Sequence, residues 1–150
     1  MPYLQAQDEA FVRQLLEKEM AGDVTLDFFT TSVSGLAMPG TEWEICEHAR
    51  KILEEFAALS PQVRLQTHGI IAESDAARSR GIDKIPGLAI VGAEDYGVRF
   101  FGMPAGYEFS TLLEAVIAVS KGTSQLSEQT LAALATLPGD AHIQVFVTPT

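Results

Sequence analysis

The spacing of hydrophobic side chains changes several times along the chain, and each change predicts a new structural element. Over residues 8–21 and 41–59, apolar residues recur every three to four positions, which is the period of an amphipathic helix. Residues 24–30 (VTLDFFT) are rich in β-branched and aromatic types and predict a buried strand, and residues 63–71 predict a second one. The first half of the chain is therefore predicted to run helix, strand, helix, strand.

The second of these helices has a clear start signal. Thr41 and Glu44 have the spacing of a capping box, in which each side chain bonds a free backbone N–H at the helix start. Residues 31–40 are mostly small and include glycine and proline, so they predict a loop before this helix.

The second half of the chain contains shorter elements that are separated by glycine, proline and small polar residues. Two strands that follow each other directly predict a hairpin in this half. We expect a short helix over 73–80, strands over 88–91 and 98–101, helices over 109–121 and 127–137, and a last strand over 143–147.

Residues 23–121 thus have the order strand, helix, strand, helix, strand, strand, helix. Strands joined by helices pair in parallel, and the adjacent pair forms one antiparallel hairpin. This is the order of the thioredoxin fold, an α/β fold whose central mixed sheet is flanked by helices, here with an extra N-terminal helix. The last strand does not fit inside this unit. We therefore expect a thioredoxin-like unit over 1–122, and over 123–150 a connecting helix with the first strand of an absent second unit.

Charge and composition narrow the classes of partner. The chain has 150 residues, of which 20 are acidic and 10 are basic, giving a net charge of −10. Nucleic acids and anionic membrane surfaces attract positive faces, so we expect neither as a partner. No stretch has the length and apolarity of a transmembrane helix, and no secretory signal is visible. One cysteine excludes an internal disulfide and a CxxC zinc site, and we expect a reducing, cytoplasmic setting without a metal or cofactor.

Several stretches carry a resemblance to a known family. They are residues 46–59 (CEHARKILEEFAAL), 81–116 and 142–150 (HIQVFVTPT), and YGVRFFGMPAGYEF over 96–109 is the most specific. On these stretches the chain resembles the N-terminal unit of the protein disulfide oxidoreductases, glutaredoxin-like proteins with two thioredoxin folds in tandem. It is more weakly similar to the N-terminal domain of the flavoprotein subunit of alkyl hydroperoxide reductase. The resemblance implies thiol–disulfide exchange, including electron delivery towards peroxide-reducing systems.

The sequence departs from this family at the reactive motif. The family commonly has C-x-x-C at the start of the second helix, where this chain has Trp43-Glu44-Ile45-Cys46, so tryptophan replaces the nucleophilic cysteine. The start of a helix favours a thiolate at Cys46, whereas the neighbouring glutamates disfavour another negative charge. Cys46 is therefore either an inert buried thiol or a single nucleophile. Dithiol–disulfide cycling within the chain would need a second sulfur.

The end of the chain also bears on the family pattern. In the family, VTPT is followed directly by the C-P-Y-C of the second unit, and this chain stops at Thr150, on the residue before that motif. We expect an isolated domain fragment, a truncated gene, or a UGA selenocysteine codon that was read as a stop. The nucleotides downstream distinguish these explanations.

Three other positions are candidates for the site. Ile85-Pro86 resembles the cis-proline loop of thioredoxins, where the residue before proline offers its backbone to an extended peptide; an ordinary turn is the alternative. Trp43 either packs over the old motif or docks a partner. Asp27 lies in a strand that is otherwise apolar, where thioredoxins carry a carboxylate that assists proton transfer at the active cysteine.

Two functions from different classes follow from these features. In the first, the chain is a docking or scaffold half that positions substrates through Trp43, Ile85 and Pro86. In the second, it is a redox enzyme whose Cys46 forms mixed disulfides with glutathione or protein thiols. Expected partners are protein thiols or disulfides, with a peroxidase or a thioredoxin reductase-like flavoprotein as candidate sources. An unpaired strand over 143–147 also predicts a homodimer through residues 141–150, or pairing of that strand onto its own sheet.

Overall fold

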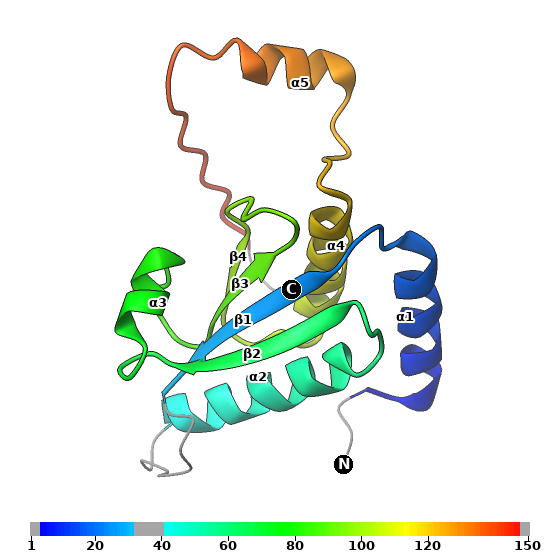
Figure 1. Cartoon of the computed structure of the whole chain (residues 1–150), viewed down its shortest axis with the longest axis vertical. Helices are drawn as coiled ribbons and strands as arrows, with labels where there is room; N and C mark the ends of the chain where they lie inside the picture. The colour runs from blue at the N-terminus through cyan, green and yellow to red at the C-terminus, as the bar shows by residue number, and fades with distance from the viewer. Residues whose placement is uncertain (1–3, 32–40, 148–150) are drawn as a thin grey trace.

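A single mixed sheet lies at the centre of the molecule (Figure 1). The computed structural model describes residues 4–31 and 41–147. In the sheet, β1 is parallel to β2 and antiparallel to β3, which is antiparallel to β4. The predicted α/β architecture is therefore confirmed. The strands, in the spatial order β2-β1-β3-β4, are β1 (Val24–Thr30), β2 (Val63–Gly69), β3 (Gly87–Val91) and β4 (Arg99–Phe101).

Helices occupy the positions that the apolar spacing predicts, within a few residues at each end. Two of them, α2 and α4, connect or follow strands, and α1 is the extra helix that precedes the first strand. The helices are α1 (Ala6–Glu19), α2 (Thr41–Ala57), α3 (Ser74–Ser79), α4 (Tyr107–Lys121) and α5 (Glu128–Ala135).

The larger hydrophobic core lies between one face of the sheet and the helices α1, α2 and α4. Successive side chains of a strand point to opposite faces, and in β1 Leu26 and Phe28 point into this core. Leu16 of α1, Phe56 of α2 and Leu112 of α4 pack against them and are fully buried. Burial of these side chains is the main stabilising term of the unit, at about 25 cal/mol for each Å² of apolar surface removed from water.

The opposite face of the sheet is covered only by α3, and its apolar cluster is much smaller. Phe29 and Ala89 of the sheet contact Ala77 of α3 and Ile82 of the loop that follows it. The remaining contacts on this face are polar. Figure 1 shows α3 standing apart from α1, on the other side of the sheet.

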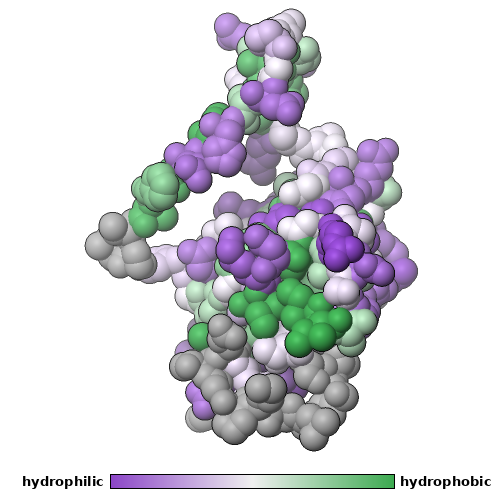
Figure 2. Space-filling view, turned by 90° about the vertical axis from the view of Figure 1, so that its left-hand side faces the viewer, coloured by the Kyte–Doolittle hydropathy of each residue, from purple (hydrophilic) through white to green (hydrophobic). Residues whose placement is uncertain are grey.

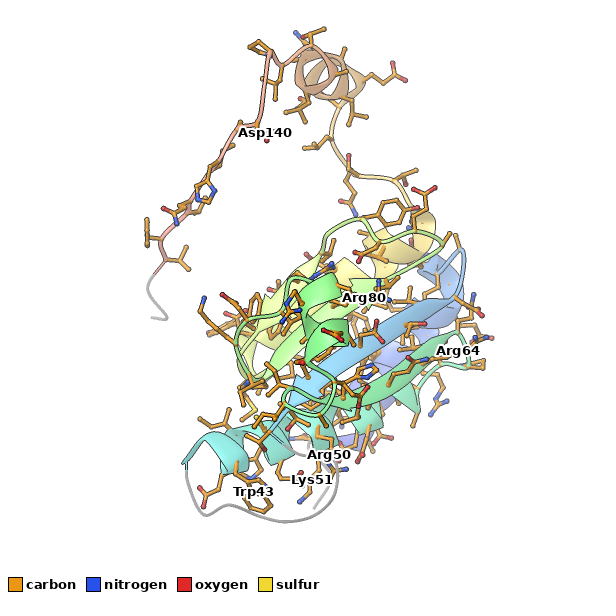
Figure 3. The ribbon with its side chains drawn as sticks, turned by 60° about the vertical axis from the view of Figure 1, so that its left-hand side comes forward. Trp43, Arg50, Lys51, Arg64, Arg80 and Asp140 are labelled. Carbon is orange, nitrogen blue, oxygen red and sulfur yellow. The ribbon has the colours of Figure 1, made fainter. Side chains whose placement is uncertain are left out.

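The predicted strand over 143–147 is not formed. Residues 141–147 have no regular structure, and Phe146 is 88% exposed. Neither this segment nor α5 contributes a buried side chain, and Figures 1 and 3 show both outside the body of the fold. Pairing of this segment onto its own sheet is therefore contradicted, because an apolar alternation alone cannot supply a partner strand.

Two expectations lie outside the described residues: the loop over 32–40 and the Thr41 side chain of the capping box. Among the described helices, none has both the length and the apolarity needed to cross a membrane.

Candidate functional site

The motif that replaces C-x-x-C occupies the first turns of α2. Cys46 is 1% exposed and lies on the face of α2 that carries the buried Ala49 and Leu53. Trp43 is half-buried, and in Figure 3 it projects from the start of α2 away from the sheet. The structure therefore turns the thiol inward and leaves part of the tryptophan ring at the surface.

A carboxylate lies next to Cys46 in the sequence and is held as an anion. Glu47 accepts two hydrogen bonds from Arg50, at 2.8 and 3.1 Å. These bonds lower the pKa of Glu47 below its usual value, although partial burial opposes the shift. The negative charge of Glu47 therefore persists at neutral pH, and like charges nearby disfavour a thiolate at the start of α2.

The loop that precedes β3 has the features expected of a docking loop. The peptide bond between Ile85 and Pro86 is cis, the isomer that the sequence predicts at this position. The carbonyl oxygen of Pro86 accepts a hydrogen bond from the N–H of Gly102 at 3.0 Å, which ties this loop to the end of β4. Within the described part of the chain, the N–H and C=O of Ile85 take part in no backbone hydrogen bond.

A glycine makes the close approach at this loop possible. A Cβ atom on Gly87 would lie 2.5 Å from the carbonyl oxygen of Lys84 and 2.7 Å from a methyl group of Ile82. The loop can fold back over the first residue of β3 only because that residue has no side chain.

The topology brings the docking loop and the start of α2 to the same end of the sheet. Phe29, near the end of β1, is the register partner of Gly87, which follows Pro86 directly. The segment after β1 leads to α2, so the first turn of α2 is found beyond that same end (Figure 1). The sequence-predicted residues Trp43, Cys46, Ile85 and Pro86 therefore share one end of the fold.

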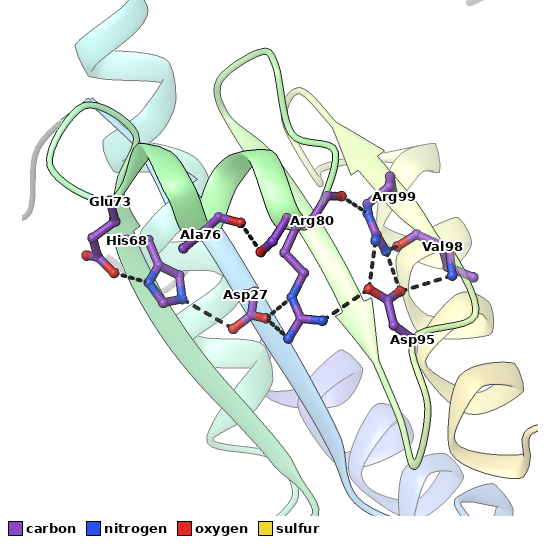
Figure 4. Close-up of polar contacts among 10 residues, drawn as sticks. Asp27, His68, Glu73, Ala76, Arg80, Asp95, Val98 and Arg99 are labelled. Carbon is purple, nitrogen blue, oxygen red and sulfur yellow. Dashed lines mark hydrogen bonds and ion pairs between the residues drawn. The ribbon is translucent and has the colours of Figure 1, made fainter.

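Asp27 lies elsewhere. Its side chain points to the face that α3 covers, whereas α2 packs on the opposite face. Its oxygens contact His68 Nε2 at 3.2 Å and Arg80 Nε at 2.9 Å (Figure 4). The described contacts of Asp27 are thus with β2 and with the end of α3, and none is with Cys46.

These contacts belong to a chain of charged groups that sequence reasoning missed. His68 Nδ1 lies 2.6 Å from a carboxylate oxygen of Glu73, and Arg80 also binds Asp95 at 3.1 Å. Asp95 in turn holds Arg99 of β4 at 2.8 Å. The alternation along β1 and β2 could have placed Asp27 and His68 on one face, but only the register of the strands shows which residues meet.

Ionisation follows from these contacts. Burial opposes the charged imidazolium of His68, but hydrogen bonds to Glu73 and Asp27 outweigh burial and raise the pKa of His68 above its usual value. Hydrogen bonds from Arg99 lower the pKa of Asp95 far below its usual range. At neutral pH the network is therefore ionic throughout its Asp95 end.

An open hollow lies beside α3 and next to the docking loop. It has a volume of about 470 Å³, and Ile70, Ala77 and Ile82 form its apolar part. Figure 2 views the molecule from the α3 side and shows apolar surface in the middle of this face. No group of three or more His, Cys, Asp or Glu side chains suited to a metal ion occurs among the residues that the structure describes.

Comparisons with known proteins place these features in context. No family model matches the chain. The flavoprotein AhpF of alkyl hydroperoxide reductase from Staphylococcus aureus is 25% identical over 125 residues, which are 83% of this chain and 22% of that protein. This chain therefore spans about a fifth of the length of the curated relatives that it matches.

Solved structures are more similar in shape than in sequence. The alkylhydroperoxide reductase protein AhpF from Enterococcus faecalis matches with a TM-score of 0.73 and 22% identity, over 91% of this chain and 62% of the other. A protein disulfide oxidoreductase from Aeropyrum pernix matches with a TM-score of 0.72 and 26% identity, over 92% of this chain and 58% of the other. The chain thus has a thioredoxin-like α/β fold, and the resemblance to protein disulfide oxidoreductases and to the AhpF proteins is confirmed.

Proposed function

We propose that this chain is a docking module of a thiol–disulfide exchange system, with little redox activity of its own. The observation that carries the proposal is the burial of Cys46, which is 1% exposed on the inner face of α2. Thiol exchange requires a thiolate that can reach its partner's sulfur, and a thiol packed into a core cannot do this. The fold of an exchange protein is therefore kept without an accessible nucleophile.

The docking surface would consist of Trp43 and the loop that ends at Ile85 and Pro86. The N–H and C=O of Ile85 can bond an extended polypeptide as an added strand would, and an aromatic ring nearby can anchor a side chain. Substrates would be protein thiols or disulfides, and the similarity to the AhpF proteins of alkyl hydroperoxide reductase favours a peroxidase or a flavoprotein as their source. A buried free cysteine fits a reducing compartment such as the cytoplasm.

A nuclear magnetic resonance titration tests the docking surface. The probe is the insulin B chain with its cysteines carboxymethylated, an extended polypeptide that cannot exchange disulfides. We expect saturable shifts of the Ile85 amide and of the Trp43 indole N–H, and their loss in Pro86→Ala. Shifts that are absent, or that persist unchanged in Pro86→Ala, would contradict docking at this loop.

The second candidate function, a single-cysteine redox enzyme, is separated by an activity assay. Reduction of insulin by dithiothreitol is followed with the chain and with Cys46→Ser. We expect no acceleration by either protein. Acceleration that is lost only in Cys46→Ser would show that Cys46 is a working nucleophile and would overturn the proposal.

A further inference from the structure

The attachment of α3 to the sheet is unusual because it relies on few apolar contacts. The helix has six residues, Ser74–Ser79, and only Ala77 among them is buried. Burial of an alanine removes little apolar surface from water, so packing holds this helix only weakly. The docking loop follows α3 directly along the chain, and something else must fix where that loop begins.

A single buried carboxylate contacts the residues that flank both ends of this helix. Arg80 follows the last residue of α3, and its guanidinium binds one oxygen of Asp27 through two nitrogens, each at 2.9 Å. Glu73 precedes the first residue of α3, and His68 links it to the other oxygen of Asp27. The side chain of Asp27 is only 6% exposed, and Figure 4 shows it between the two partners.

Arg80 is also the point from which the docking loop departs. Its carbonyl oxygen accepts a hydrogen bond from Arg99 Nε, so its backbone and its side chain are both held by charged groups. The next residue, Gly81, has a φ of 66°, a left-handed conformation that glycine adopts without strain, and it turns the chain towards Ile82 in the small apolar cluster. The loop then runs to Ile85.

We propose that Asp27 is a positioning residue for the docking loop over 81–86: by holding both ends of α3 on β1, its carboxylate fixes Arg80 and thereby the backbone that Ile85 offers to a partner. Asp27 does not touch the partner in this arrangement. The part that concerns binding rests on the proposed function, whereas the part that concerns the loop does not.

Hydrogen exchange of backbone amides tests whether Asp27 holds the loop. The N–H groups of Gly81 and Ile82 bond carbonyl oxygens of α3, at 3.0 and 2.9 Å, and report on this junction. In Asp27→Asn we expect these two amides to exchange at least about tenfold faster than in the original chain, after correction for the change at Phe28 in the centre of β1. An equal change at all three amides would mean that Asp27 only stabilises the fold, and would overturn the proposal.

Matched variants keep this test decisive. Asp23→Asn removes an exposed carboxylate near the start of the same strand, paired with Arg64 at 2.7 Å, and should leave the amides of the loop unchanged. Arg80→Lys keeps the charge but loses the two-pronged contact with Asp27, and should speed exchange at Gly81 and Ile82 if Asp27→Asn fails to fold. An Arg80→Lys chain with unchanged exchange would overturn the proposal in that case.

The carboxymethylated insulin B chain separates the two proposals. We expect Asp27→Asn to weaken its binding by about tenfold while Asp23→Asn binds like the original chain. No binding by the original chain would sink the docking function, and the exchange data would still decide whether Asp27 holds the loop. Equal binding by the original chain and Asp27→Asn, with faster loop exchange, would show that docking does not depend on this positioning.

Discussion

Asp27 and Cys46 are both buried, but their surroundings give them different roles. A buried carboxylate is costly unless it is paired, and Asp27 has cationic or imidazole partners on both oxygens. A neutral thiol carries no such requirement, and free cysteine is among the residue types most often buried. The structure therefore places strong polar interactions on the α3 face and leaves Cys46 as part of the packing of α2.

The raised pKa of His68 makes this network depend on pH. Because the folded chain favours the imidazolium, its contacts with Asp27 and Glu73 contribute fully to stability below about pH 6.5, the usual value for histidine. The contribution is lost as the pH rises through the raised pKa. We expect His68→Gln to lower the free energy of unfolding by about 1–2 kcal/mol at low pH and by less above that pKa.

Urea unfolding of both chains at about pH 6 and about pH 9 measures this difference. The other histidines are present in both chains, so their titration cancels in the comparison. A difference that is the same at the two pH values would show that the charge of His68 does not contribute.

Among the helices, α1 lies before the repeating order of strands and helices but is part of the core. Leu16 is fully buried against the sheet side of the larger core, whereas Phe11 on the same helix is 64% exposed. We expect Leu16→Ala to cost about 2–5 kcal/mol of stability and Phe11→Ala less than about 1 kcal/mol. Denaturant unfolding checks both, and equal small effects would mean that α1 is a loose addition.

The elements of the body follow from the sequence because local signals and burial agree there. The apolar spacing over 109–121, for example, predicts the helix whose Leu112 and Val116 are fully buried. The segment over 143–147 has an equally apolar pattern, but a strand forms only when another strand bonds it. The Asp27 network was beyond prediction for a related reason, since it joins residues that are far apart in the sequence.

On the scale of the whole molecule, the segment over 126–147 is a large apolar surface without a partner in this chain. Soluble monomers rarely expose contiguous apolar patches of more than a few hundred Å², so we expect this one to be covered. Its exposed large apolar side chains are Leu126, Leu131, Leu134, Leu137, Ile143, Val145, Phe146 and Val147.

We expect the chain to form a homodimer through this segment, because two copies can pair the extended residues 143–147 with each other. Light scattering after size-exclusion chromatography should give a dimer for the full chain and a monomer after removal of residues 141–150. The same mass for both chains would place the contact elsewhere or exclude it.

Alkylation of Cys46 by iodoacetamide, followed by mass spectrometry, tests most directly whether this molecule docks partners or exchanges disulfides. Because Cys46 is 1% exposed, we predict that the native chain stays unlabelled during the time in which the urea-denatured chain is labelled completely. Full labelling of the native chain at the rate of the denatured one would mean that the thiol reaches solvent. That result would contradict the docking account and favour Cys46 as a nucleophile.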